Sequence, residues 1–128
     1  MFYLLVGIDT EGDNQWSVEA RLNQTFDNIY ALPALHALFQ RHRVRPTYLV
    51  TYPVVQDARS ADELRALRES RDTEIGAHHH AWETPPCTEA DVRRHPYALQ
   101  LPAAQFGEQL ATLSQAITDA IGERPLSY

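Results

Sequence analysis

The chain has 128 residues, of which 44% are hydrophobic and 22% charged, and its formal net charge is −6 at pH 7. This composition is typical of one modest globular domain and excludes a fibrous or disordered chain. The negative charge argues against nucleic acid as a partner. The single Cys87 excludes an internal disulfide and a cysteine-based zinc knuckle.

The first half of the chain predicts two strands with a helix between them. A near-continuous apolar run at residues 2–8 predicts a strand covered on both faces. Polar residues 10–24 predict a loop. Apolar residues then recur at helical spacing from Leu32 onward, with a proline in the first turn and a weaker turn at residues 26–30. The β-branched and aromatic run at residues 46–51 predicts the second strand.

The second half predicts two helices and two short strands. Ser60 can cap a helix, with a glutamate in the capping-box position. Residues 74–77 predict a third strand, and residues 78–101 a long loop of the kind that is usually functional. Gly122 ends the clearest helix, and residues 125–128 resemble a fourth strand. The apolar stripe of that helix comprises Phe106, Leu110, Leu113, Ile117 and Ile121.

This order of elements predicts an α/β fold with parallel strands and crossover helices. No run of 18 apolar residues is present, so no membrane helix is expected. The N-terminal run has neither a basic start nor a small-residue cleavage site, which argues against an export signal and for a cytoplasmic location.

Three carboxylates follow the first predicted strand within the sequence "GIDTEGDN". Asp9, Glu11 and Asp13 alternate along the chain, and in an extended segment alternate side chains share one face. Neighbouring carboxylates repel each other unless a cation or a proton lies among them. An acidic loop that only caps a helix is the alternative interpretation.

Three consecutive histidines follow the third predicted strand in "EIGAHHHAW". His78 and His80 point the same way if the segment is extended, and the carboxyl ends of parallel strands share one rim. Two imidazoles and a carboxylate suit Zn²⁺ or another divalent first-row metal. A solvated loop is again the alternative. For the isolated His36, His42 and His95, structural roles are expected.

With these motifs the chain resembles the polysaccharide deacetylase family, the NodB-homology domains of carbohydrate esterases. The resemblance rests on "DTE" at residues 9–11, on "EIGAH" at residues 74–78 followed by a second histidine, and on the order of strands and helices. It implies a distorted (β/α) barrel, a metal held by one carboxylate and two histidines, and hydrolysis of an N- or O-acetyl group. It makes Asp9 the general base, Glu11 the metal carboxylate and His78 the first metal histidine.

The chain departs from the family pattern at two positions near this motif. Thr10 separates acids that are usually adjacent, which leaves exchanged roles for Asp9 and Glu11 as an alternative. Trp82 stands where the family has its second metal histidine, so that ligand is His80 or comes from elsewhere. His79 is then expected to point toward the substrate or a neighbouring strand. Trp82 is expected either to stack on a sugar ring or to pack in the interior.

The resemblance also implies that residues 1–128 form the N-terminal half of the barrel. The family motifs that supply an arginine, an oxyanion element and a general-acid histidine would follow this half. We therefore expect one partial domain, truncated before those motifs, with little catalysis when isolated. An open half barrel has an unpaired edge at its last strand, which favours self-association.

The function predicted from the sequence is a metal-dependent hydrolase, with zinc as the expected metal, that removes an acetyl group from an acetylated sugar or glycan. One alternative is a related amide hydrolase acting on a small cyclic or linear amide. Another is a catalytically silent carbohydrate-binding or assembly domain. A flavodoxin-like or response-regulator fold also places acids after the first strand, but this chain has no lysine to pair with them.

Overall fold

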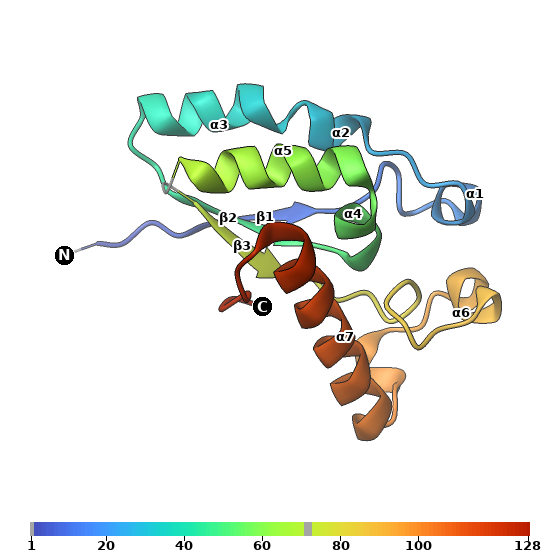
Figure 1. Cartoon of the computed structure of the whole chain (residues 1–128). Helices are drawn as coiled ribbons and strands as arrows, with labels where there is room; N and C mark the ends of the chain where they lie inside the picture. Colours follow the sequence, from blue (N-terminus) through green and yellow to red (C-terminus); the bar gives the residue numbers. More distant parts are fainter. Residues whose placement is uncertain (1, 71–72) are drawn as a thin grey trace.

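A parallel sheet of three strands, in the order β1-β2-β3, forms the centre of the chain (Figure 1). The structure is a computed structural model that describes residues 2–70 and 73–128. Its strands are β1 (Val6–Thr10), β2 (Pro46–Val50) and β3 (Glu74–Ala77). Because helical segments connect consecutive strands, the predicted α/β class with parallel strands and crossover helices is confirmed.

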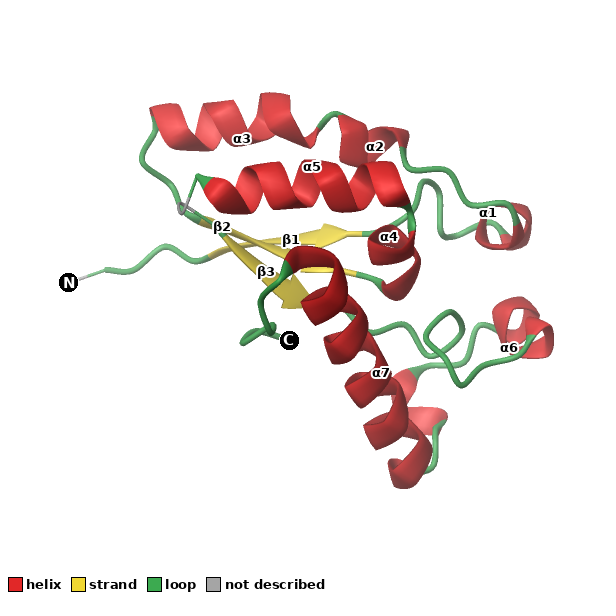
Figure 2. Ribbon diagram, in the orientation of Figure 1, coloured by secondary structure: helices red, strands yellow, loops and turns green. Residues whose placement is uncertain are grey.

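Helices occupy most of the remaining chain, as Figure 2 shows. They are α1 (Val18–Leu22), α2 (Asp27–Tyr30), α3 (Leu32–Arg41), α4 (Tyr52–Gln56), α5 (Ala58–Glu69), α6 (Glu89–Arg94) and α7 (Ala103–Ile121), with a 3-10 turn at Ala98–Gln100. Among the described residues, none of these helices has the length and apolar character needed to cross a membrane.

The hydrophobic core covers one face of the sheet. Tyr48 and Val50 of β2 are fully buried, and strand alternation places both side chains on the same face. They share one cluster with Leu64 of α5 and with Leu113 and Ile117 of α7. The helices that contribute to this cluster therefore pack on that face. Figure 1 shows α3 and α5 running along one side of the strands.

The opposite face of the sheet is thinly covered, which corrects the prediction of a first strand buried on both faces. Gly7 and Asp9 of β1 are exposed on it, while Leu49 of β2 lies between Gly7 and Gly76. A Cβ atom at Gly76 would lie 2.7 Å from Leu49 Cδ2. A side chain at this position would therefore require Leu49 to shift, and its Cβ atom would also lie 3.1 Å from the carbonyl oxygen of Ser127. One covered face and one open face are compatible with part of a barrel.

The first strand is also shorter than predicted. It begins at Val6, which pairs with Pro46, the first residue of β2. Phe2 and Leu5, at the two ends of the apolar run before it, are therefore exposed, because no partner strand extends far enough to bury them. Residues 125–128 form no assigned strand either. Nevertheless, the carbonyl oxygen of Ser127 accepts a hydrogen bond of 2.9 Å from the amide of Ala77 in β3.

Several helix boundaries differ from the predictions. Asp57 caps α5, since its Oδ2 accepts a 2.8 Å hydrogen bond from the amide of Ser60, so the predicted Ser60 cap is wrong. The predicted loops at residues 10–24 and 78–101 contain α1 and α6, and α4 was not predicted. The predicted start of α3 at Leu32 is confirmed, as is the predicted end of α7 at Gly122, which is its C-cap with a φ of 84°.

Candidate metal centre

The candidate centre lies where the carboxyl ends of the three strands meet. The parallel ladder continues one step beyond the strands, because the amide of Thr51 donates to Thr10 O and that of His78 to Val50 O, over 3.1 and 2.8 Å. These bonds hold the chains that leave β1 and β3 on either side of the chain that leaves β2. Carboxylates and imidazoles from distant parts of the sequence therefore reach one rim, as the parallel order predicts.

Glu11, His78 and His80 form a cluster whose metal-ligating atoms all lie within 4.8 Å of one another. The Oε2 atom of Glu11 lies 3.5 Å from Nε2 of His78 and 3.1 Å from Nε2 of His80. The two imidazole centroids are 4.6 Å apart. Within the described residues this is one group of three potential ligands, and its donor set of two nitrogens and one oxygen suits a divalent first-row metal.

The charges of the cluster are strongly coupled in the protein without a cation. Hydrogen bonds from His78 and then His80 lower the pKa of Glu11 to about 2, although burial opposes the shift. Burial lowers the pKa of His80, but its hydrogen bonds to Glu11 and Glu83 outweigh that effect and raise the pKa to about 9. In the metal-free protein a proton on the His80 imidazole therefore offsets the negative charge of Glu11 and Glu83, as a bound metal ion would.

Asp9 lies beside this cluster but outside its short contacts. Its Oδ1 atom is 3.9 Å from Nδ1 of His78, and 65% of its side chain is exposed. Glu11 is thus the acid that approaches both imidazoles closely, and Asp9 is an adjacent carboxylate with access to solvent. This arrangement matches the predicted roles of a metal carboxylate at Glu11 and a base at Asp9 better than it matches the exchanged roles.

Asp13 does not share a face with the other two acids, contrary to the expectation from alternation. The strand ends at Thr10, and Asp13 lies in the following turn. Its carboxylate accepts hydrogen bonds from Thr25 Oγ1 at 2.8 Å and from the amides of Asp27 and Asn28 at 2.8 and 3.1 Å. Hydrogen bonds from Thr25 and those amides lower its pKa against the opposing effect of burial. Asp13 therefore anchors the start of α2.

The side chain of His79 points away from the cluster, toward α7. Its Nε2 donates to Oε1 of Gln109 over 2.7 Å, and its ring packs edge-on against Phe106. The amide of Gln109 also donates to the carbonyl oxygens of Ala81 and Pro86, over 3.2 and 3.0 Å. Gln109 is completely buried and fastens the histidine segment to α7. The structure thus gives His79 a packing partner, and its predicted contact with substrate stays a prediction.

Trp82 is buried against two imidazoles. Its ring centroid lies 4.0 Å from that of His80, at an interplanar angle of 23°, and 3.8 Å from that of His95. These contacts favour the packing role among the two roles considered from the sequence. They also place His95 at the candidate site, although it was expected to have only a structural role. The local sequence gave no signal for the contact with Trp82, because His95 is the C-cap of α6 and meets Trp82 in the folded chain.

Glu83 is a further site residue that was not singled out from the sequence. It is buried, and its Oε1 accepts a 2.7 Å hydrogen bond from Nδ1 of His80, while Oε2 accepts one of 3.0 Å from Gln24. An ionised carboxylate only accepts hydrogen bonds, so His80 carries a proton on Nδ1 and directs Nε2 toward Glu11. Carboxylates commonly orient metal-binding histidines in this way. The sequence signal that could have identified Glu83 was its position three residues after His80.

The other two histidines have the structural environments expected for them. The buried imidazole of His36 lies within hydrogen-bond distance of Tyr48 and Ser70, at 3.1 and 3.2 Å, and His42 is the C-cap of α3.

No protein-family model, curated protein or solved structure matches this chain at the threshold applied. The functional argument therefore depends on the geometry of the site.

Proposed function

We propose that the chain binds one divalent metal ion through Glu11, His78 and His80, and that it is a hydrolase of the polysaccharide deacetylase type. The observation that carries the proposal is the convergence of these three side chains, with ligand atoms within 4.8 Å, beside the solvent-accessible carboxylate of Asp9. Zinc suits the donor set, although other first-row ions do as well. The finer fold proposed with it is the N-terminal part of a distorted (β/α) barrel.

The chain's own residues supply the remaining parts of the chemistry. A metal ion bound here would lower the pKa of a water molecule and polarise the carbonyl group of an acyl substrate. Asp9 is placed to accept the proton of that water on its carboxylate. Glu83 holds the proton on His80 Nδ1, so the proton that a metal ion would displace is the one on Nε2. The class of substrate proposed is an acetylated sugar, in keeping with the sequence motifs.

Metal analysis is the first test, because it does not depend on knowing the glycan. After loading with Zn²⁺ and removal of excess metal, the wild-type chain should retain roughly one ion per molecule. Glu11→Gln and His80→Ala should lose it, whereas Asp13→Asn should retain it because the bonds of Asp13 to other described residues lie at the start of α2. Metal retention that is the same in all three variants would contradict the proposed centre.

Acetyl release from acetylated glycans is the second test, with and without EDTA. Asp9→Asn should retain the metal and lose the low residual turnover expected of this chain, since the amide cannot accept the proton. Release of ammonia or a free acid from small amides in place of acetate would favour the amide-hydrolase alternative. Binding of sugars that is unaffected both by EDTA and by Asp9→Asn, with no turnover, would favour a silent binding domain. A cytoplasmic location remains a prediction from the sequence.

A further inference from the structure

A cavity of about 360 Å³ adjoins the candidate metal centre. Its volume lies within the range of small-molecule sites. The metal-centre residues line one part of it, and the part that we call the aromatic compartment is lined by Trp16, His95, Tyr97 and Ala98. The buried Arg21 ties the segment of Trp16 to that of His95, because it donates to Gln15 O over 2.8 Å and to Val92 O over 3.2 Å.

A series of stacked rings separates the aromatic compartment from the metal ligands. The ring centroid of Trp82 lies 4.0 Å from that of His80 and 3.8 Å from that of His95. The centroid of His95 in turn lies 5.7 Å from that of Tyr97 and 6.4 Å from that of Trp16. Two rings thus stand between His80 and each outer ring. A group bound on the outer rings is therefore a different part of the ligand from the group that reacts at the metal centre.

The outer rings of the aromatic compartment are accessible. Trp16 is 83% exposed and Tyr97 is 59% exposed, although both line the cavity. Single exposed aromatic residues are common, but two that face one cavity beside a candidate active site indicate a binding surface. Burial, and then the nearby charge of Arg21, lower the pKa of His95, whose ring neighbours both. All three rings are therefore uncharged near neutral pH.

The aromatic compartment offers ring faces and few polar contacts. The side-chain amide of Gln15 and the indole nitrogen of Trp82 are buried, so these atoms cannot contact a ligand. Within the described part of the chain no arginine lines the cavity, and the sequence has no lysine. A phosphate or carboxylate group lacks a partner of that kind here, and sugar hydroxyl groups would lose hydrogen bonds to water without replacement. A flat aromatic ring loses no such bonds and stacks on its neighbours.

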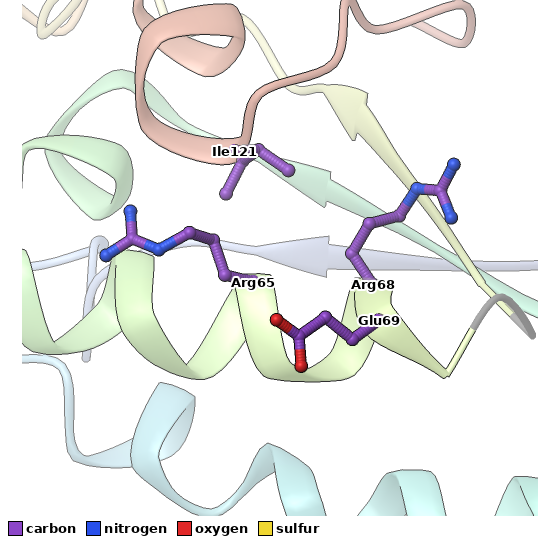
Figure 3. A pocket seen from close by; sticks show the side chains of 4 residues that line it. All are labelled: Arg65, Arg68, Glu69 and Ile121. Atoms are coloured by element: carbon purple, nitrogen blue, oxygen red, sulfur yellow. The ribbon is translucent and has the colours of Figure 1, made fainter.

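A hollow between α5 and α7 lacks these features (Figure 3). Two arginines, a glutamate and an isoleucine line it, and among these described residues none is aromatic. Arg65 donates to Ala120 O over 2.6 Å, and Arg68 pairs with Glu123. Because both guanidinium groups already bond within the chain, the hollow is a weaker candidate for a ligand site than the aromatic compartment.

We propose that the aromatic compartment binds a flat, uncharged aromatic ring attached to the acetylated sugar that reacts at the metal centre. The substrate would then be a small glycoside with an aromatic aglycone, and not a polysaccharide. This inference rests on the proposed function, because it takes the acetylated sugar as the reacting unit. Trp16 and Tyr97 would stack on the aglycone, while the acetyl group lies at Asp9 and Glu11.

The test compares the methyl, cyclohexyl and phenyl glycosides of N-acetylglucosamine by calorimetry, on the chain kept metal-free in EDTA so that turnover does not interfere. The cyclohexyl and phenyl groups are similar in size, but only the phenyl group is flat and aromatic. The phenyl glycoside should bind about tenfold more tightly than the methyl glycoside and about threefold more tightly than the cyclohexyl glycoside. The disaccharide of N-acetylglucosamine should bind no more tightly than the methyl glycoside.

Variants of the two exposed rings assign the binding to the aromatic compartment. Trp16→Ala and Tyr97→Ala should each reduce the preference for the phenyl over the methyl glycoside to about twofold or less, whereas Trp16→Phe should keep most of it because a ring remains. Tyr3→Ala is the matched control, because Tyr3 is also 83% exposed and does not line the cavity. The sequence has two tryptophans and Trp82 is buried, so the phenyl glycoside should also change the fluorescence of the exposed Trp16.

Four results would overturn the aromatic compartment: no binding of the phenyl glycoside, equal affinity for the phenyl and cyclohexyl glycosides, tighter binding of the disaccharide than of the phenyl glycoside, or losses in Trp16→Ala and Tyr97→Ala no larger than that in Tyr3→Ala. Metal retention measured on the same proteins separates this failure from failure of the proposed function. If the wild type retains the metal but does not prefer the phenyl glycoside, only the aromatic compartment is wrong. If the metal centre fails the tests with Glu11→Gln and His80→Ala, the proposed function fails independently.

Discussion

The Nδ1–H group of His80 donates a hydrogen bond of 2.7 Å to the buried carboxylate of Glu83. This contact fixes which nitrogen of the imidazole remains available to a metal ion. Replacing the carboxylate with an amide of the same shape weakens that control, because an amide can present either a donor or an acceptor to the ring. Loss of the contact between His80 and Glu83 is therefore expected to change metal affinity and not overall folding.

We expect Glu83→Gln to lower zinc affinity by about 10- to 100-fold, which is the usual effect of losing a partner that orients a metal-binding histidine. Competition with a chromophoric chelator measures this directly. Glu89→Gln is the control, since Glu89 is exposed and its partner among the described residues is Arg93 on α6. Equal affinity in Glu83→Gln and the wild type would mean that His80 is oriented by its packing against Trp82 alone.

The pH dependence of stability should identify the coupled charges in the metal-free protein. The pKa of Glu11, lowered from 4.5 to about 2, means that its contribution to stability is present above pH 4.5 and lost as pH falls toward 2. The pKa of His80, raised from 6.5 to about 9, means that its contribution is present below pH 6.5 and lost as pH rises through 9. Together these groups should stabilise the fold most between pH 4.5 and 6.5.

Urea denaturation in EDTA at a series of pH values checks this. The stability difference between the wild type and Glu11→Gln should be largest between pH 4.5 and 6.5 and should shrink toward pH 9. With Zn²⁺ present the trend above pH 6.5 should reverse, because the metal requires an imidazole without its second proton. A stability difference that stays constant over this range would contradict the coupling between Glu11 and His80.

The sequence predicted the rim of the candidate site better than it predicted its surroundings. Asp9 lies near the end of β1, and Glu11, His78 and His80 lie just beyond strand ends. The periodicity and composition that predict these strands are local, and parallel order alone brings the strand ends together. Asp13 was misjudged because alternation holds only while the chain is extended, and the strand ends before that residue. No local pattern shows where a strand ends when its length depends on a partner.

Long-range contacts account for most of the remaining differences. Gln109 looks like a polar interruption of the α7 stripe, and only the folded chain shows that its amide is required by a loop that lies far away in sequence. His95 comes to Trp82 through the packing of α6 near α1, which no spacing encodes. The exposure of Phe2 and Leu5 follows from the length of β2, because a strand is buried only where neighbours cover it.

Gln109 gives a prediction about the segment that carries the metal ligands. Its amide satisfies His79 Nε2 and the carbonyl oxygens of Ala81 and Pro86. Gln109→Leu removes these partners while keeping a similar volume, so it should reduce the free energy of unfolding by about 2–4 kcal/mol. Gln115→Leu on the exposed side of α7 should change it by less than about 0.5 kcal/mol. Chemical denaturation measures both variants.

The same pair of variants should also differ in metal affinity. When the histidine segment is no longer held to α7, ordering it on metal binding costs conformational entropy, so zinc should bind more weakly in Gln109→Leu than in Gln115→Leu. If Gln109→Leu is destabilised but binds zinc as tightly as the control, the bonds to Gln109 support the fold and do not preorganise the centre.

The apolar residues before β1 predict self-association of the isolated chain. Leu4 and Leu5 are 81% and 91% exposed, and they continue the direction of a strand that forms one edge of the sheet. Unpaired edges bearing apolar side chains favour pairing with another chain, and a charged residue at such an edge opposes it. Sedimentation velocity should therefore show mass that increases with protein concentration, and Leu4→Lys should reduce the increase.

Leu99→Lys is the matched control for this last measurement, because Leu99 is equally apolar and 89% exposed but lies in the 3-10 turn far along the chain from β1. A similar reduction in both variants would show that added charge, and not the edge of the sheet, controls association. A chain that remains monomeric at all concentrations would contradict the prediction, and would mean that the exposed segment does not pair in solution despite its composition.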